Sequence, residues 1–304
     1  MTKRPKTSPT LPLGESGLTV SRLAWGMWRF KGDDVAAAQA CVEAALEAGI
    51  TFFDTADIYG LGNGEPFGAA ETLLGRVLAQ APHLRERFVL ATKGGIRPGV
   101  PYDSSEAYLI AALDASLKRL GVEQVDLYQI HRPDVMTHPE ALARTLGRML
   151  AAGKIAEVGV SNFTPAQITA LQTYLVFPIA STQIELSPLV IAPIEDGALD
   201  QAMTLNLGVM AWSPLAQGRL GDVAAADPRT AAVRDALEEL GAAHGVSRSV
   251  AAYAWLMAHP AKPIPIVGSQ QPARIAEAAK ALTIEIDRAA WYKVLVAARG
   301  APMP

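Results

Sequence analysis

Short apolar runs alternate with helical patterns along the chain, and this alternation limits the possible folds more than any other feature. The runs "ITFFD", "RFVLATK" and "VDLYQIH" precede the helical patterns "AAETLLGRVLAQ", "SSEAYLIAALDASLKRLG" and "HPEALARTLGRMLAAG". Eight such units are present in 304 residues. Apolar runs of about five residues without period-two alternation are typical of parallel strands covered on both faces. The pattern therefore predicts an α/β fold, a single (β/α)8 barrel domain over residues 1–304.

An open, doubly wound sheet is the alternative fold with the same alternation. Such a sheet usually carries G-x-G-x-x-G after its first strand, and that motif is missing there. The glycines of "GLGNG" at 60–64 follow the second strand instead and indicate a flexible loop. No Pro/Gly linker or shift of composition divides the chain. The barrel is therefore the favoured prediction.

Both ends of the chain predict additions to the barrel. The segment "TLPLGESGLTVSRL" predicts a β-hairpin with "ESG" as its turn, placed to close the bottom of the barrel. Residues 1–10 are expected to be flexible. The segment "IDRAAWYKVLVAAR" predicts one further helix on the outside, and the two helical stretches 229–244 and 247–258 add others.

Composition excludes several classes of protein. The formal net charge of −3 does not suit a nucleic-acid-binding protein. Cys41, the single cysteine, lies in a helical pattern, where it predicts a small core residue rather than a disulfide or a metal ligand. The basic N-terminus has no apolar segment behind it, and no window resembles a membrane-spanning helix. We expect a cytoplasmic monomer without a membrane partner.

Four side chains with acid–base chemistry follow the predicted strands. Asp54, Lys93 and His131 end the second, third and fourth apolar runs, and Tyr59 comes five residues after Asp54. Each has an ordinary explanation alone: Asp54 as a helix cap, Lys93 as an exposed loop residue, His131 as a structural residue, Tyr59 as a half-buried aromatic. Because a barrel brings the carboxyl ends of its strands to one mouth, we expect the four to form a cluster.

The expected cluster suits the reduction of a carbonyl group. A free tyrosine has a pKa near 10, and a neighbouring Lys93 cation would favour the anion of Tyr59. Asp54 would keep Lys93 protonated and in place, while His131 would orient the substrate oxygen. Tyr59 would then protonate a developing alkoxide. Since no side chain donates hydride, the reaction needs a nicotinamide cofactor.

The chain closely resembles the aldo-keto reductase superfamily from about Leu11 to Arg299. The resemblance lies in the segments "DTADIYG", "LATKGG", "LYQIHRPD", "GVSNF", "TQIELSP" and "WSPLAQGRL". It implies a (β/α)8 barrel that binds NADP(H) without a Rossmann fold and reduces small-molecule aldehydes or ketones. It also implies that Tyr59 is the general acid/base, supported by Lys93, Asp54 and His131.

The resemblance further implies contacts to cofactor and substrate. A helix N-terminus attracts phosphate and Arg274 suits a ribose 2′-phosphate, so NADPH is favoured over NADH. Trp212 would stack on the nicotinamide, whereas Ala278 stands where the family usually has Asn. The substrate contacts would be Trp25, Trp28, Tyr59 and His131. The cofactor contacts would be Gly26, Met27, Asp54, Ser161, Asn162, Gln183, Trp212, Ser213, Leu215, Gly218, Gly268, Ser269, Arg274 and Glu277.

Two other functions are compatible with parts of the sequence. A sensor subunit that binds NADP(H) but turns over slowly would keep the same four residues. A metal-dependent barrel hydrolase would need clustered ligands at strand ends, and of the five histidines only His131 lies at one; we therefore expect no metal. The short tail after Arg299 predicts an open pocket lined by Trp25, Trp28, Tyr59 and Phe30.

Overall fold

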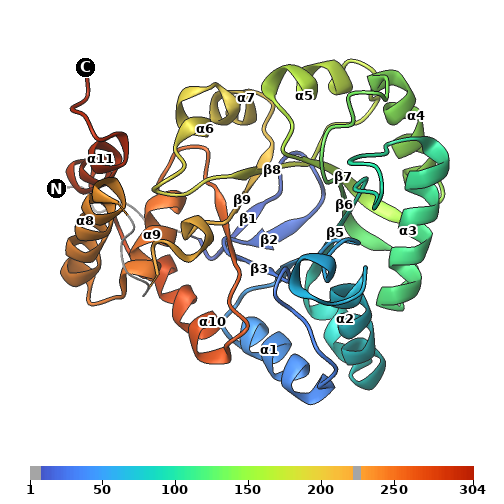
Figure 1. The fold of residues 1–304 in the computed structure, drawn as a ribbon, viewed down its shortest axis with the longest axis horizontal. Coiled ribbons are helices and arrows are strands. Elements are labelled where there is room, and N and C mark those ends of the chain that lie inside the picture. The colour runs from blue at the N-terminus through green and yellow to red at the C-terminus, as the bar shows by residue number, and fades with distance from the viewer. Residues whose placement is uncertain (1–7, 222–226) are drawn as a thin grey trace.

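Eight short parallel strands form a closed barrel in the computed structural model, which describes residues 8–221 and 227–304 (Figure 1). The strands follow one another around the barrel in chain order, and the last pairs with the first. The predicted (β/α)8 barrel is confirmed. The strands are β3 (Ala24–Gly26), β4 (Phe52–Asp54), β5 (Val89–Gly94), β6 (Val125–Ile130), β7 (Ile155–Ser161), β8 (Ser181–Glu185), β9 (Gly208–Trp212) and β10 (Ile264–Val267).

Helices surround the barrel and cover its outer face (Figure 1). Single helices separate most strands, whereas α6 and α7 separate β8 from β9, and α8 and α9 separate β9 from β10. The helices are α1 (Val35–Glu47), α2 (Ala69–Gln80), α3 (Glu106–Leu120), α4 (Pro139–Ala151), α5 (Pro165–Gln172), α6 (Ala192–Glu195), α7 (Ala198–Thr204), α8 (Pro228–His244), α9 (Arg248–Met257), α10 (Pro272–Ala278) and α11 (Arg288–Arg299).

Local sequence explains where many of these helices begin. At the start of α5, Thr164 accepts a hydrogen bond from the Gln167 backbone and Gln167 reciprocates, with Pro165 at the first helical position. Such caps satisfy backbone N–H groups that the helix itself leaves without partners. Side chains of the same kind cap the N-termini of α1, α3, α8, α9 and α11, namely Asp34, Ser105, Asp227, Ser247 and Asp287.

The added helix α11 lies outside the barrel beside α8, as predicted (Figure 1). Its Trp291 ring stacks on Trp255 of α9, with ring centroids 5.0 Å apart. Each of the two indole N–H groups donates to the backbone carbonyl of the other residue, at 2.9 and 3.0 Å. Both indole N–H groups thus have hydrogen-bond partners, so both rings can pack in the apolar layer.

The N-terminal hairpin is also present, formed by β1 (Thr10–Pro12) and β2 (Thr19–Ser21). Leu13, in its turn, is fully buried among residues of the barrel interior. The flexible terminus that we expected over residues 1–10 falls mainly on 1–7, which lie outside the described residues. Thr10 is already paired with Ser21 in the hairpin.

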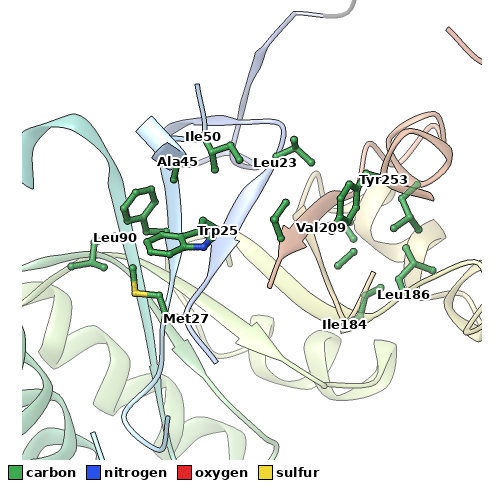
Figure 2. Packing of buried hydrophobic residues seen from close by; sticks show 14 of the residues in the cluster. Leu23, Trp25, Met27, Ala45, Ile50, Leu90, Ile184, Leu186, Val209 and Tyr253 are labelled. Carbon is green, nitrogen blue, oxygen red and sulfur yellow. The ribbon is translucent and has the colours of Figure 1, made fainter. Parts of the chain in front are cut away.

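Two apolar layers hold the strands, one inside the barrel and one between the barrel and the helices. Successive residues of a strand point to opposite layers. Ala24 and Phe52 thus belong to the interior, whereas Trp25 and Phe53 face the helices. Figure 2 shows Trp25 in the outer layer, surrounded by other apolar side chains.

Candidate active site

A buried ion pair lies at the carboxyl ends of β4 and β5. The Lys93 ammonium is 2.7 Å from the Asp54 carboxylate, both side chains are almost fully buried, and Lys93 also donates to the Thr55 carbonyl at 2.8 Å. The other Asp54 oxygen accepts hydrogen bonds from the amides of Gln183 at 2.8 Å and Gln129 at 3.2 Å. These partners offset the cost of burying both charges and hold them in one geometry.

The phenol of Tyr59 lies above this ion pair. Tyr59 follows β4 on a loop that is tied to β5 by a hydrogen bond from Asp57 N–H to the Lys93 carbonyl, at 3.0 Å. The Lys93 ammonium is 5.0 Å from the Tyr59 ring centroid, close enough to favour the phenolate electrostatically. The rings of Trp28 and His131 approach Tyr59 edge-to-face, at centroid distances of 5.2 and 5.9 Å.

Burial dominates the acid–base properties of Tyr59. It raises the pKa of the phenol, Lys93 lowers it, and Asp54 raises it, so that the pKa lies above its ordinary value. The expected effect of Lys93 is therefore present but is outweighed by burial. Burial also acts to lower the pKa of Lys93, whereas Asp54 and Tyr59 raise it, and the net pKa is raised. At neutral pH Lys93 is charged and Tyr59 is protonated.

His131 follows β6 and is held as a neutral imidazole. Burial, Lys93 and Arg132 lower its pKa well below the ordinary value. Its backbone N–H donates to the Gly94 carbonyl at 2.9 Å, which extends the pairing of β5 with β6. Its Nδ1 is buried without a hydrogen-bond partner among the described residues. A neutral imidazole can donate one hydrogen bond to a substrate oxygen.

A polar network joins the ends of the next strands around the mouth. Asn162, which has a left-handed φ of 60°, donates to the Ser161 hydroxyl at 2.8 Å and to the His131 carbonyl at 3.1 Å. Its side-chain oxygen accepts the indole N–H of Trp212 at 3.0 Å. Ser161 donates to the Gln183 carbonyl at 3.1 Å. The amides, hydroxyl and ring that the sequence predicted for a nicotinamide are thus gathered at one place.

The loop after β9 has an unusual backbone. Ser213 and Gln217 have left-handed φ values of 54° and 58°, and the Gln217 N–H donates to the Ser213 hydroxyl at 2.8 Å. Leu215 is half-buried, whereas Gly218 is exposed with a φ of 92° and open space around it. The exposed glycine leaves the backbone accessible to a bound group, such as the predicted pyrophosphate.

The loop after β10 is tied to β3 by side chains. Gln270 donates to the Gly26 carbonyl at 3.0 Å, and the Trp25 indole donates to the Ser269 carbonyl at 2.9 Å. The buried Cys41 thiol lies 3.2 Å from the Gln270 carbonyl. These contacts place Gly26 and Ser269, both expected at the cofactor, on neighbouring segments. Cys41 has the expected role of a buried core residue.

The remaining predicted cofactor residues lie on or next to α10. Gly268 precedes the helix and has the Arg29 guanidinium as its neighbour. Arg274 is exposed and Glu277 is half-buried on α10. Both lie close enough to Tyr253 to affect its pKa. Ala278 is buried at the end of the helix, so its side chain serves the packing of α10.

Two predicted pocket residues do not line the mouth. Trp25 is fully buried against the rings of Phe30 and Phe53, at 5.4 and 5.1 Å, and Phe30 is also buried. The prediction that Trp25 contacts the substrate is therefore wrong, because this residue of β3 points outward to the helices. Trp28, by contrast, is 42% exposed beside Tyr59. Met27 has a fully buried side chain and offers only its backbone.

Sequence reasoning missed two features next to the cluster. Gln129 lies inside the barrel, paired in register with Lys93. Asp57 is fully buried behind β5, near a Glu71–Arg119 ion pair of 2.7 Å. Both are polar residues within apolar stretches, "DLYQI" and "FFDTADIYG", and that interruption was the available signal.

Other kinds of site receive no support from the described ranges. Among residues 8–221 and 227–304, no three histidine, cysteine or carboxylate side chains are grouped so that they could hold a metal. No helix in those ranges has the length and apolar character needed to cross a membrane.

Comparisons with known proteins give a family and several relatives for this chain. A family model described as "Aldo/keto reductase family" matches residues 22–294. A "6-dehydroglucose reductase" from Novosphingobium aromaticivorans is 57% identical over 297 residues, covering 96% of each chain. A protein of the same name from Agrobacterium fabrum is 37% identical, and "Oxidoreductase YdhF" from Escherichia coli is 34% identical; each alignment covers more than nine-tenths of both chains.

The fold has a solved counterpart as well. The crystal structure of the thermostable aldo-keto reductase Tm1743 superposes with a TM-score of 0.80 at 23% identity, covering 95% of this chain and 99% of that one. The family match agrees with the barrel fold and with the polar side chains at the ends of its strands. The chain is an oxidoreductase of the aldo/keto reductase family.

Proposed function

We propose that the protein reduces an aldehyde or ketone to the alcohol with NADPH, and that Tyr59 is the general acid. One observation carries this proposal: the protonated Tyr59 phenol lies on the buried Lys93–Asp54 ion pair, with neutral His131 beside it. The raised pKa of the phenol keeps its proton at neutral pH, ready for transfer. The nearby ammonium stabilises the phenolate that remains.

The side chains divide the work of the reaction. NADPH, when bound, supplies hydride to the carbonyl carbon. Tyr59 Oη transfers its proton to the carbonyl oxygen, so that the C=O bond becomes a C–OH bond. Lys93 stays charged and stabilises the phenolate, and Asp54 holds Lys93 in position. His131 donates a hydrogen bond that orients the carbonyl oxygen.

The residues at the mouth suit a nicotinamide dinucleotide. Ser161, Asn162 and Gln183 offer hydroxyl and amide groups to a carboxamide, and Trp212 offers a flat ring. The loop with Gly218 would follow the pyrophosphate. Arg274 on α10 would bind the 2′-phosphate, which favours NADPH over NADH.

The relatives suggest the class of substrate. The 57% identical protein from Novosphingobium aromaticivorans and the 37% identical one from Agrobacterium fabrum are both named 6-dehydroglucose reductase. We propose that this protein likewise reduces a sugar aldehyde, with 6-dehydroglucose as the first candidate. This proposal is more specific than the sequence prediction, which is an open pocket without a named substrate.

Steady-state kinetics with the Tyr59→Phe variant test the proposal. The variant keeps the ring but loses the proton, so kcat should fall by about 10²–10⁴-fold, the usual contribution of a general acid. NADPH binding, followed by tryptophan fluorescence, should be preserved. The matched control is Tyr292→Phe on α11, where the ring is exposed.

Two results would contradict this proposal. If Tyr59→Phe reduced 6-dehydroglucose and 4-nitrobenzaldehyde as fast as the wild type, Tyr59 would not be the acid. If the wild type bound NADPH tightly but turned over neither aldehyde, the sensor function considered above would replace the reductase.

A further inference from the structure

Arg132 occupies a defined position at the mouth of the barrel. It follows His131 at the end of β6 and is half-buried. The carbon of its guanidinium lies 6.0 Å from the centroid of the Trp212 indole, within the range of a cation–π contact. Trp212 is itself fixed by the hydrogen bond to Asn162, so the guanidinium rests on an ordered surface.

The guanidinium has unused hydrogen-bonding capacity. No residue in the ranges 8–221 and 227–304 accepts a hydrogen bond from it or pairs with its charge; its contact is the ring face of Trp212. Half-buried arginines elsewhere have oxygen partners, as Arg119 has in Glu71 and Arg248 in the carbonyls of Leu220 and Gly221. An arginine that stacks on a ring keeps its N–H donors free in the plane.

The charge of Arg132 reaches the proposed reacting groups. It lowers the pKa of both Tyr59 and His131, which lie on either side of the expected carbonyl position. Arg132 therefore lies on the same side of the barrel as the proton donor. A substrate whose carbonyl meets Tyr59 and His131 would therefore have the carbons next to that carbonyl near Arg132.

We infer that Arg132 is a substrate-binding residue that selects aldehydes carrying hydroxyl groups close to the carbonyl. Its N–H donors match the lone pairs of adjacent hydroxyl oxygens. This inference rests on the proposed function and deepens it, because it names the residue that would favour a sugar aldehyde over a simple one.

A matched pair of three-carbon aldehydes tests the inference. D-Glyceraldehyde and propanal differ only in two hydroxyl groups, so the ratio of their kcat/KM values measures hydroxyl recognition. Arg132→Met should lower this ratio by about 10–100-fold, mainly through KM of glyceraldehyde, as expected for hydrogen bonds to a charged group. Loss of the positive charge also alters Tyr59, but it affects both aldehydes and cancels in the ratio.

Two further variants make the test specific. Arg132→Lys keeps the charge but not the planar fork, so its ratio should lie between those of the wild type and Arg132→Met. Arg144→Met removes the same charge from the outer surface of α4, where the side chain is 60% exposed, and should leave the ratio unchanged. An unchanged ratio in Arg132→Met, or an equal fall in Arg144→Met, would overturn the inference.

A binding measurement separates this inference from the proposed function. D-Glucose carries the hydroxyl pattern of the sugar aldehyde, and its affinity for the NADPH-bound protein can be measured by calorimetry without turnover. Affinity that falls about 10-fold or more in Arg132→Met supports the inference even if the wild type reduces neither 6-dehydroglucose nor 4-nitrobenzaldehyde, a result that would refute the reductase alone. Reduction of both aldehydes with glucose affinity and ratio independent of Arg132 would refute the inference alone.

Discussion

Two aspartates three residues apart, Asp54 and Asp57, have opposite surroundings. Both Asp54 oxygens accept hydrogen bonds, including those from the charged Lys93. Asp57 is fully buried, and neither of its oxygens has a hydrogen-bond partner among the described residues. Burial and the Glu71 carboxylate raise the pKa of Asp57 well above its ordinary value, whereas Arg119 and Lys93 lower it less. We therefore expect a neutral carboxylic acid at Asp57.

This difference predicts how Asp57 affects stability as pH changes. Between about pH 4 and its raised native pKa, Asp57 keeps a proton that the unfolded chain has lost, so the native state binds more protons. Its contribution to the free energy of unfolding is complete below pH 4. It declines as pH rises, by at most about 1.4 kcal/mol per pH unit for one proton. Asp57→Asn cannot ionise and should lose less stability than the wild type between about pH 5 and pH 8.

Urea unfolding at the two pH values measures this difference. Asp235→Asn, at an exposed position of α8, is the control and should follow the wild type at both pH values. If Asp57→Asn lost as much stability as the wild type between the two pH values, Asp57 would be ionised in the native protein.

At the scale of single residues, the sequence predicts where a functional side chain lies in the fold better than it predicts which side chains surround it. The ends of apolar runs identified Asp54, Lys93 and His131, and the structure places them together, because the first two point into the barrel and His131 follows the next strand. Trp25 was misplaced because a three-residue strand does not reveal which of its neighbours points inward. The surroundings of Asp57 come from α2 and α3, and no local pattern announces them.

At the scale of elements, two glycines inside helices differ in how much room their surroundings leave for a side chain. Gly75 in α2 lies where α2 meets α3, and a Cβ there would be 2.0 Å from the Arg119 carbonyl oxygen. Gly147 in α4 has more room, since the nearest atom to its Cβ would be a Phe177 ring carbon at 4.0 Å. The same substitution should therefore have opposite effects at the two positions.

We expect Gly147→Ala to stabilise the protein by about 0.5–1 kcal/mol, because alanine is the better helix former. Gly75→Ala gains the same preference but forces α2 and α3 apart, and should destabilise by about 1–3 kcal/mol. Urea unfolding of both variants measures the difference. Stabilisation by Gly75→Ala would show that the approach of α2 to α3 does not depend on Gly75, and destabilisation by Gly147→Ala would show that a Cβ at Gly147 is not accommodated.

The sequence predicts most helices and strands, but it does not predict where a helix is interrupted. The pattern "AAETLLGRVLAQ" gives α2 over its full length, because its apolar face has the helical period. The segment "PIEDGALDQAMTLN" folds as two helices, α6 and α7, with Gly197 between them at a φ of 88°. That left-handed residue ends one helix and starts another, a choice that the apolar pattern does not encode.

At the scale of the whole molecule, the two ends of the barrel differ in the residues that they carry. The polar cluster lies at the carboxyl ends of the strands, and the hairpin of β1 and β2 covers the opposite end. Barrel closure was predictable from eight units, because parallel strands with helices between them must bury both faces. How the hairpin is seated was not, since it depends on backbone that is distant in sequence, including the Ala180 carbonyl next to Gly14.

Leu13 tests this division between the two ends. Its side chain is fully buried in the barrel interior and fills the space above Gly208, whose Cβ would lie 2.4 Å from it. Leu13→Ala should lower the free energy of unfolding by about 2–5 kcal/mol, through lost burial and the cavity that remains. Urea unfolding measures this loss, and Val176→Ala, at a position 98% exposed, is the control and should change stability by less than about 0.5 kcal/mol.

The same variant should retain kcat at a temperature where it is fully folded, because Leu13 lies at the far end of the barrel from Lys93 and Tyr59. A large loss of stability with unchanged kcat would mean that the hairpin closes the barrel without shaping the site. A fall of kcat in the folded variant would mean that the interior residues transmit the seating of the hairpin to the mouth. Unchanged stability would mean that the hairpin covers the barrel end without contributing to its core.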